Sequence, residues 1–577
     1  MLAGFLRESF TKMMILNRAI GFFVFVFAPL VATAATRREM STKHQLLVPE
    51  FVGTYWPLRP AETATCDPGA QSTEFEGELV ERRSDARRTT FATVPSAATR
   101  ARIQLSWPAL DNQGRPLTYG NYSPADPQVA PGDEMIAASS NNQIGFYARD
   151  GWMLDNYSIK DFFAPLNHST VFSSANIDVY VDPRLQFSPA MHRFFAVALA
   201  EHRGVYDYPP SCDYDAFCFE DFVVLAVSTS SSPFSPWNYY FWPAVIGRHE
   251  SSSEEFVPGD HADYPMIGMT PDILAISTNV LNPTARSYGN LQILPLLPLV
   301  AGQLTIGEQW WALPPPGASF ADFIQPASDE TAAAGTLTAT AASYNTAQVF
   351  QFRDLFSGFS SLSVGSVAID TIQGGVYGLQ PGSCPSLDTW WGVWLEAAQR
   401  DKKLIIVAEN SAGGGNAARV LSIDLSSPPS VKLEWDVLIG AGGTDGESPS
   451  AVVTYWFGAA NITRDGTTVV VYNRASKDIA PEVRVSTIGA DGRLAPSILL
   501  RASDGCYVGN GTNGTKRWAD LACAAIDPTN SDVVWVAAQY VVTDNPNFGV
   551  YVGAIEVPPV PVDPIPKPVN TTSHPER

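Results

Sequence analysis

The stretch "DHADYPMIGMTPDILAISTNV", residues 260–280, outlines one small β-hairpin. An Asp-Tyr-Pro corner at Asp263 leads into a short apolar segment, residues 269–272 supply a turn, and a second apolar segment follows. Proline and aspartate preset such a turn, and the flanking isoleucine, leucine and valine residues fit a pleated strand. Because a lone hairpin cannot bury its apolar faces, this stretch leads us to expect further copies along the chain.

Four other segments have the same outline. Each has an acidic or small-residue corner, an apolar strand, a turn rich in Pro, Asn, Asp or Gly, and a strand rich in β-branched and aromatic residues. The five copies start near Asp133, Asp182, Asp263, Ser448 and Asp520. Where no copy is missing, the spacing is about 50 to 80 residues, which suits four-stranded propeller blades with long outer loops.

We therefore predict an all-β fold, a β-propeller of about six to seven four-stranded blades. The propeller is expected over residues 131–556, after an irregular N-terminal leader or first blade at 35–130 and before a Pro-rich disordered tail at 557–577. A β-sandwich array and a β-helix are the competing interpretations. A sandwich array would show linkers between its units, and no linker interrupts residues 130–556.

The first residues are typical of an export signal. Basic residues precede the apolar run "AIGFFVFVFAPLVATAA", and the small residues at 32–34 suit a signal peptidase, so residues 1–34 are expected to be removed. An uncleaved anchor helix is the alternative, although Pro29 interrupts a run that is short for a membrane span. We expect a secreted or cell-surface protein, a monomer without a membrane span once the signal is cleaved.

Charge and cysteines agree with an extracellular protein. The formal net charge is −21, which disfavours nucleic acid as a partner. Six cysteines are compatible with three disulfides in an oxidising compartment. Spacing favours Cys212 with Cys218 and Cys506 with Cys523, which leaves Cys66 with Cys384. The sequons considered for glycosylation are Asn156, Asn167, Asn461, Asn510 and Asn513, the last two within a glycine-rich loop at 509–516.

The segments "DPRLQFSPAMHRFF", "VVLAVSTSSSPFSPWNYYFWP", "ADYPMIGMTPDILAISTN" and "RWADLACAAIDPTNSDVVWVAAQY" are similar to those of large secreted β-propeller proteins, mostly bacterial and often described as sialidase-like. The resemblance extends from about Asp133 to Ile555 and implies the fold. The family pattern after Arg517-Trp518 usually continues Gly-Asp-Tyr, whereas this chain has Ala-Asp-Leu. Corners near the axis supply the axial-face candidates Asp182, Arg184, Asp263, Tyr264, Arg517, Trp518 and Asp520, with Asp182, Asp263 and Asp520 at equivalent positions.

Catalytic residues are not identifiable from the sequence. There is no serine-hydrolase elbow and no metal-ligand spacing among the histidines and cysteines. Arg184, Arg474, Arg484 and Arg517 are candidates to converge on the axis, but pairing with Asp182 or Asp520 between blades is the favoured interpretation. No cofactor is certain. The densest set of oxygen ligands, a weak Ca²⁺ candidate, is the acidic loop with Asp213, Asp215, Glu220 and Asp221.

Clustered aromatic side chains suggest contact with carbohydrate, because their flat faces stack on sugar rings. The clusters are Trp237, Tyr239, Tyr240 and Trp242; Trp310 and Trp311; and Trp390, Trp391 and Trp394. Core packing between blades is the favoured interpretation for most of them. We expect a non-catalytic recognition or adhesion module, with glycan or a surface protein as partner. An extracellular glycoside hydrolase or lyase of the sialidase-like kind is the alternative, and a structural surface component is the second alternative.

Overall fold

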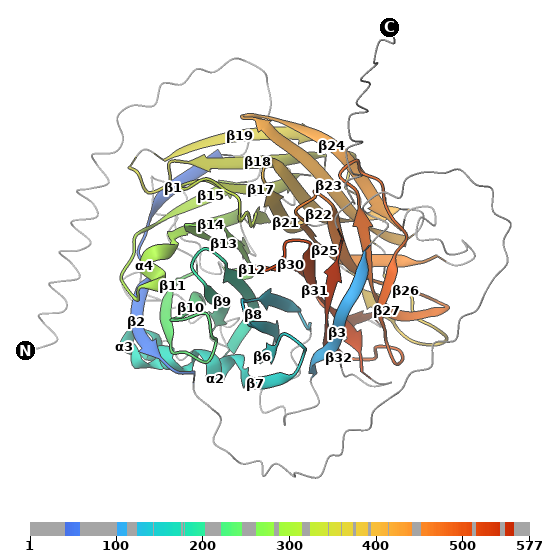
Figure 1. Cartoon of the computed structure of the whole chain (residues 1–577), viewed down its shortest axis with the longest axis horizontal. Helices are drawn as coiled ribbons and strands as arrows, with labels where there is room; N and C mark the ends of the chain where they lie inside the picture. The colour runs from blue at the N-terminus through green and yellow to red at the C-terminus, as the bar shows by residue number, and fades with distance from the viewer. Residues whose placement is uncertain are drawn as a thin grey trace, which may run out of the picture. The chain divides into compact units, whose positions relative to one another are not determined.

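Seven strands lie around one axis in the computed structural model, and each contacts the next until the cycle closes (Figure 1). In order around the ring they are β4 (Gln128–Pro131), β8 (Val179–Ser188), β12 (His261–Met269), β16 (Ile324–Pro326), β21 (Trp394–Arg400), β25 (Thr454–Ile462) and β30 (Cys523–Ile526). Each is the innermost strand of its own sheet. The predicted β-propeller is therefore confirmed, and it has seven blades.

The structure describes residues 41–57, 101–111, 124–141, 143–174, 177, 179–201, 221–244, 261–281, 288–313, 323–343, 345–358, 360–372, 375, 377–389, 394–412, 415–440, 452–509, 515–542 and 548–558. All of them belong to one compact unit, Met40–Arg577. The expected signal at 1–34 lies outside these residues, as does nearly all of the Pro-rich tail. None of the described helices has the length and apolar character needed to span a bilayer.

Each blade continues outward from its innermost strand as an antiparallel sheet, and most blades have four strands. Blade 1 adds β5 (Met135–Ser140), β6 (Gln143–Ala148) and β7 (Met153–Ser158); blade 2 adds β9 (Arg193–Glu201), β10 (Asp221–Ser228) and β11 (Trp237–Pro243); blade 3 adds β13 (Ile273–Leu281), β14 (Tyr288–Pro295) and β15 (Gly307–Leu313). Blade 4 adds β17 (Leu337–Ser343), β18 (Thr346–Arg353) and β19 (Ser361–Ala368); blade 5 adds β22 (Lys403–Ala412), β23 (Gly415–Ser427) and β24 (Ser430–Ile439). Blade 6 adds β26 (Thr468–Ser476), β27 (Ile479–Ile488) and β28 (Ile498–Ala502), and blade 7 adds β31 (Val533–Val541) and β32 (Phe548–Glu556).

The middle strands of the blades have apolar side chains on both faces, because a neighbouring blade covers each face. In β31, "VVWVAAQYV", every residue is buried. Its side chains separate into two clusters, with Val534 and Val536 in the cluster that includes blade 6 and Trp535 and Ala537 in the cluster that includes blade 1. Burial of this kind contributes about 25 cal/mol per Å² of apolar surface, so each blade depends on its neighbours for stability.

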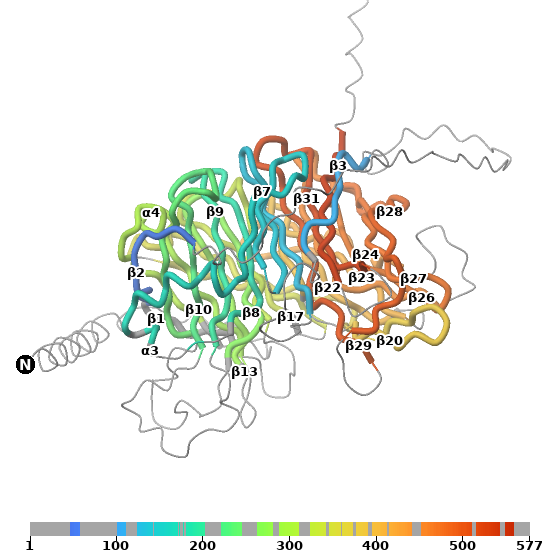
Figure 2. The backbone as a smooth tube through the Cα atoms, turned by 90° about the horizontal axis from the view of Figure 1, so that it is seen from below, coloured from blue at the N-terminus to red at the C-terminus, as the bar shows by residue number. Residues whose placement is uncertain are grey.

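Three strands from the N-terminal region complete the outside of three blades. β1 (Ser41–Leu47) pairs with β15, and β2 (Glu50–Tyr55) pairs with β11, so that blades 3 and 2 have five strands. β3 (Arg102–Asp111) pairs with β32 and is the fourth strand of blade 7. Figure 2 shows blue β3 beside the red part of the chain that contains β31 of blade 7. The described part of residues 35–130 therefore supplies outer strands to blades 2, 3 and 7. It also contains the start of β4 in blade 1, which begins at Gln128, three residues before the expected boundary.

Most innermost strands are kinked by a bulge. The bulges in β8 and β12 lie beside Asp182 and Tyr264, both with positive φ, and each of these residues precedes a proline. Phe457, which precedes a glycine, has the same conformation in β25, and Asp126 adopts it just before β4. A bulge bends the strand and increases its twist near the axis. The counterpart of Asp182 is thus Tyr264, and Asp263 lies one residue earlier, so the predicted equivalence of Asp182 with Asp263 is off by one position.

The hairpin predicted near Asp133 differs from the other copies. It forms β5 and β6, the second and third strands of blade 1, whereas the copies at Asp182 and Asp263 form the first and second strands of theirs. The corner equivalent to Asp182-Pro183 is Asp126-Pro127. Since β4 has only four residues, its strand pattern is too short to be recognised in the sequence.

Short helices occupy two of the connections between strands. α2 (Ile159–Phe163), η2 (Ala164–His168) and α3 (Thr170–Ser174) follow β7, and Phe162 and Phe163 of α2 enter the core between blades 1 and 2. Ser158 caps α2 by accepting the backbone N–H of Asp161 at 3.0 Å. α4 (Leu296–Val300) follows β14 and adds Leu296 and Leu299 to the core between blades 2 and 3.

Candidate functional site

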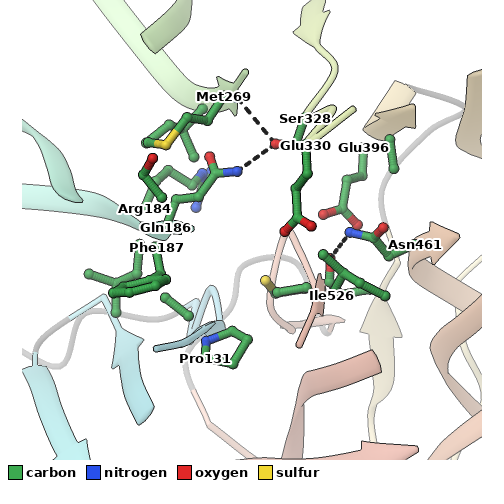
Figure 3. A pocket seen from close by; sticks show the side chains of 18 of the residues that line it. Pro131, Arg184, Gln186, Phe187, Met269, Ser328, Glu330, Glu396, Asn461 and Ile526 are labelled. Carbon is green, nitrogen blue, oxygen red and sulfur yellow. Dashed lines mark hydrogen bonds between the residues drawn. The ribbon is translucent and has the colours of Figure 1, made fainter. Parts of the chain in front are cut away.

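A narrow cavity follows the axis, and all seven innermost strands contribute to its wall. Its volume is about 110 Å³. Figure 3 shows side chains from several blades turned into this space, among them Gln186, Glu330, Glu396 and Asn461. The cavity opens where the innermost strands end, at a mouth that we define by Ala190, Glu330 and Arg400.

The innermost strands present one unpaired edge to the axis, so their backbone N–H and C=O groups need other partners. Ser328 supplies one such partner between blades 2, 3 and 4. Its Oγ accepts the backbone N–H of Met269 at 3.3 Å and an N–H of the Gln186 amide at 2.7 Å (Figure 3). On this side of the cavity, the Ser328 hydroxyl thus connects three blades through hydrogen bonds.

Glu396 and Asn461 likewise bond to backbone groups between blades 5, 6 and 7. Glu396 Oε2 accepts the backbone N–H of Ala460 at 3.0 Å, and Asn461 donates to the carbonyl of Ala524 at 3.1 Å. Burial raises the pKa of Glu396 to about 8, although hydrogen bonds from Ala460 and Ala524 and the charge of Arg184 act in the opposite direction. Glu396 is therefore mostly protonated at neutral pH, and one of its oxygens is occupied by a backbone hydrogen bond between blades.

At the mouth, two ionisable groups remain uncommitted. Neither the Glu330 side chain nor the Arg400 side chain forms a hydrogen bond or an ion pair with any residue that the structure describes. Loss of water around its carboxyl group, with smaller effects of Asp329 and Asp527, raises the pKa of Glu330 to about 7, and the charge of Arg400 opposes that shift. Because the Glu330 side chain is exposed, solvent screens part of this effect. A carboxyl and a guanidinium thus face the mouth without being paired.

A buried polar network lies at the opposite end of the axis, where the innermost strands begin. The Asp182 N–H donates to Asn141 Oδ1 at 2.6 Å, Asn141 donates to Asp126 Oδ2 at 2.7 Å, and Asp126 Oδ1 accepts the Asp520 N–H at 2.8 Å. Arg517 forms an ion pair with Asp520. This chain of bonds joins blades 7, 1 and 2, so it connects the last blade to the first.

Two acids of this network, Asp126 and Asp520, have raised pKa values. Burial, together with the nearby Asp182, raises the pKa of Asp126 to about 7. Burial and the neighbouring Asp126 raise the pKa of Asp520 well above its usual range, against the effect of Arg517. The structure thus brings Asp182, Arg517 and Asp520 together. Asp182 and Asp520 form hydrogen bonds to blade 1, and Arg517 pairs with Asp520. Asp126 and Asn141 were not predicted, although the Asp126-Pro127 corner repeats Asp182-Pro183.

Arg184 and Tyr264 also meet near the axis. Arg184 is only 1% exposed, its Nε donates to the carbonyl of Pro265 at 2.6 Å, and its guanidinium carbon lies 5.5 Å from the centre of the Tyr264 ring. Tyr264 is 3% exposed and packs against Phe323 and Leu521. Pairing of Arg184 with Asp182 or Asp520, the favoured interpretation of the sequence, is not among the ion pairs of the described residues. Both Arg184 and Tyr264 are held inside the protein, away from the mouth.

The other predicted arginines and Trp518 lie within or between blades. Arg474 on β26 and Arg484 on β27 both pair with Glu482, at 2.8 Å and 3.0 Å, so they do not converge on the axis. Trp518 is buried and donates to Asn473 Oδ1 at 3.1 Å. These side chains stabilise blade 6 and its contact with the segment before blade 7.

The calcium candidate is only partly within the described residues. Asp221 is buried at the start of β10 and accepts the backbone N–H of Ala262 at 2.8 Å, which joins blade 2 to blade 3. Asp213, Asp215 and Glu220 lie outside the described residues. In the part of the chain that the structure describes, no group of three or more His, Cys, Asp or Glu side chains is arranged to hold a metal ion.

Aromatic side chains mostly fill the core, as the sequence interpretation favoured. Trp237, Tyr239, Tyr240 and Trp242 on β11 are all buried. Trp310 packs against Phe352, with ring centres 5.2 Å apart. The side chains of Trp311, Trp390, Trp391 and Trp394 lie outside the described residues. None of these five described side chains lines the axial cavity.

The sequons occupy three different environments. Asn167 is exposed in η2, and Asn156 is half-buried in the outermost strand of blade 1. Asn461 lines the axial cavity and bonds to Ala524, so the folded chain does not present it as a surface acceptor. Asn510 and Asn513 lie outside the described residues.

The predicted cysteine pairing is wrong for the residues that the structure describes. Cys384 and Cys506, 122 residues apart, form a disulfide, and Cys523 is a buried free thiol. The reason is that the fold brings together the connecting segments that contain Cys384 and Cys506. β20 (Ser386–Asp388) pairs in parallel with β29 (Thr515–Arg517), and Gln380 exchanges hydrogen bonds of 2.9 Å and 2.7 Å with the backbone of Tyr507. Cys66, Cys212 and Cys218 lie outside the described residues.

Mapping of the disulfides by mass spectrometry tests this correction. Digestion without reduction is expected to release a peptide pair that joins Cys384 to Cys506. Cys523 should be alkylated only after denaturation, because it is buried between blades 7 and 1 and burial raises the pKa of its thiol. A peptide pair that joins Cys506 to Cys523 would contradict the structure.

Comparison with known proteins gives distant likenesses only. No protein-family model matches the sequence, and no curated protein matches it either. Among solved structures, a Trypanosoma rangeli sialidase in complex with sialic acid has a TM-score of 0.32 at 10% identity, covering 66% of this chain and 54% of the sialidase. A Fusarium graminearum α-L-arabinofuranosidase in complex with an iminosugar inhibitor has a TM-score of 0.35 at 9% identity, covering 80% and 98%. A Synechocystis apocarotenoid oxygenase mutant has a TM-score of 0.34 at 8% identity, covering 67% and 74%.

The chain thus matches about half the length of the sialidase. The sequence resemblance to sialidase-like propellers holds as a distant structural likeness, without a family to accompany it. None of these likenesses assigns a reaction to this chain, because unrelated functions share such folds.

Sequence reasoning missed the residues of the mouth and the cavity, Glu330, Glu396 and Arg400. One signal was available in β21, "WLEAAQR", where an acid and a base stand in a strand otherwise rich in apolar and small residues. Burying charge is costly, so such residues in an inner strand indicate either a partner across the axis or a site.

Proposed function

We propose that this chain is a secreted, non-catalytic recognition propeller that binds an extracellular glycan at the face where the axial cavity opens. The observation that carries the proposal is the mouth, where Glu330 and Arg400 lie beside one cavity lined by all seven blades. Propellers commonly present binding groups near their axis, since each blade contributes one strand there. The export signal and the sialidase-like resemblance in the sequence agree with an extracellular glycan.

The size of the cavity favours binding over cleavage. Ligand sites that enclose a small molecule usually have about 300 to 1,000 Å³, and a cavity of about 150 Å³ holds only a benzene molecule. At about 110 Å³, the axial cavity is too small to enclose a sugar ring around its scissile bond. Only the edge of a terminal sugar fits, with the rest of the glycan outside the mouth.

One observation favours a glycoside hydrolase as the second candidate. Two carboxyls, Glu330 and Glu396, have raised pKa values and line the same cavity as Arg184 and Arg400. A general acid with a pKa near neutrality is what such an enzyme needs. Against it, Arg184 is buried against Pro265, and Glu396 already accepts a backbone hydrogen bond.

Obstructing the mouth tests the proposal. Ala190 is an exposed residue of the turn after β8 and lines the cavity, so Ala190→Trp fills the mouth without altering the core. On a glycan array, the wild-type protein and Ala190→Ser are expected to bind the same glycans, and Ala190→Trp is expected to bind them at least about tenfold more weakly.

Fluorogenic glycosides, including a sialoside, complete the test. No hydrolysis above background is expected. Hydrolysis that Glu396→Gln abolishes would reverse the order of the two candidates. Binding that Ala190→Trp leaves unchanged would place recognition elsewhere on the protein.

A further inference from the structure

The proposed function does not specify the class of sugar. The charged side chains at the mouth restrict which sugars can bind there. We propose that the mouth recognises an uncharged sugar, whose hydroxyl groups bridge Glu330 and Arg400, and that it rejects sugars carrying a carboxylate. This inference rests on the proposed function and specifies its ligand.

Glu330 and Arg400 are held side by side by the backbone. Ser328 and Ala398 form a parallel bridge, and the N–H of Gln399 donates to the carbonyl of Ser328 at 2.8 Å. The segment that leads to Glu330 therefore runs beside the end of β21, and each residue lies two positions beyond the bridge. The two charges act on one another, yet they form no ion pair.

Adjacent hydroxyl groups satisfy both side chains at once. A hydroxyl can donate to a carboxylate and accept from a guanidinium, whereas an ammonium serves only the carboxylate and a carboxylate group serves only the guanidinium. Hydrogen bonds to charged groups are stronger than those between neutral groups. Two adjacent hydroxyl groups of a neutral sugar are thus the smallest group that can hydrogen-bond to both Glu330 and Arg400.

The surrounding charge disfavours an anionic sugar. Asp329 and Asp527 both act on Glu330, and both are occupied by other partners. Asp329 accepts hydrogen bonds from Thr331 and Gln399, and Asp527 pairs with Arg149. Arg400 is thus the one described cation at the mouth without a partner, and it is outnumbered by acids. A sugar carboxylate would meet repulsion there in addition to the net charge of −21.

A matched glycan set tests this selectivity. The probes are oligosaccharides with one common core, ending either in a neutral hexose or in a sialic acid. The proteins are the wild type, Arg400→Gln and Glu330→Gln, with Glu134→Gln as the control. Glu134 is an exposed acid in the turn after β4, and it does not line the cavity.

The wild type and Glu134→Gln are expected to bind the neutral form at least about tenfold more tightly than the sialylated form. Arg400→Gln should weaken neutral binding by about tenfold, and Glu330→Gln should narrow the gap between the two forms. A preference for the sialylated form, or neutral binding that Arg400→Gln leaves unchanged, would overturn this inference while leaving glycan recognition in place. If the wild type binds neither form, the proposed function fails as well.

Discussion

Between pH 5 and pH 9, the protein is expected to lose stability as the pH rises. Burial raises the pKa of both Glu396 and Glu409 to about 8 in the folded state, and burial with the nearby Asp182 raises that of Asp126 to about 7. A group whose pKa is higher in the folded state than in the unfolded state binds its proton more tightly when folded. Its stabilising contribution is therefore complete below pH 4 and is lost as the pH rises through 7 and 8.

The expected effect is large for a single group. A shift of one pKa unit corresponds to about 1.4 kcal/mol, so moving the pKa of a fully buried glutamate from 4.5 to about 8 corresponds to at most about 5 kcal/mol. Three such acids outweigh the usual fall in stability that protonated surface ion pairs cause at low pH. Thermal unfolding at intervals of one pH unit should show a Tm several degrees lower at pH 9 than at pH 5.

Glu409→Gln isolates one of these acids. Glu409 is 0% exposed, its Oε1 accepts the N–H of Phe457 at 2.7 Å, and its Oε2 has no partner among the described residues. Glutamine keeps the acceptor and removes the titration. The Tm difference between pH 5 and pH 9 is expected to shrink in Glu409→Gln and to persist in Glu134→Gln. Parallel pH profiles for Glu409→Gln and the wild type would contradict the account of buried neutral acids.

Removal of β3 is expected to have the largest effect on folding. β3 is the outermost strand of blade 7 and comes from the other end of the chain, so its pairing with β32 closes the ring. Two truncated proteins differ in this strand alone: one begins at Ala101 and the other at residue 112. The first should unfold in one cooperative transition, and the second should be insoluble or lack such a transition, because the closing blade loses its outer cover.

Trp107→Ala provides a milder version of the same test. Trp107 on β3 is 8% exposed and packs against Tyr147 of blade 1 and Trp535 of blade 7, with ring centres 5.9 Å and 5.6 Å apart. The free energy of unfolding should fall by about 3–5 kcal/mol, as for other buried large-to-alanine changes. Equal Tm values for both truncated proteins, with no loss in Trp107→Ala, would show that β3 does not close the ring.

The sequence predicted those elements whose strands and turn are adjacent in the chain. The hairpins at Asp182 and Asp263 were predicted because their turns and strands are contiguous, and such patterns follow from short-range physics. The three N-terminal strands were not predicted. Arg102 of β3 and Glu556 of β32 form an ion pair although they are 454 residues apart in the sequence. A strand whose partner is so distant has no adjacent turn residues that would indicate the pairing.

The same limit applies to the site. Spacing favoured a bond between Cys506 and Cys523, but the fold places Cys384 beside Cys506. Glu330 and Arg400 are ordinary residues in the sequence, 70 positions apart by their numbers, and only ring closure and the bridge between Ser328 and Ala398 bring them to one mouth. Axial corners were recognisable because proline marks them, whereas the raised pKa values of Asp126 and Asp520 depend on burial that no local pattern reports.

A crystal structure with the tightest-binding neutral oligosaccharide would test the central claim most directly. We expect electron density for a terminal sugar at the axial mouth, with hydroxyl groups within hydrogen-bond distance of Glu330 and Arg400. Density on the outer strands of the blades, or at the groove beside Arg419 in blade 5, with an empty mouth, would contradict it.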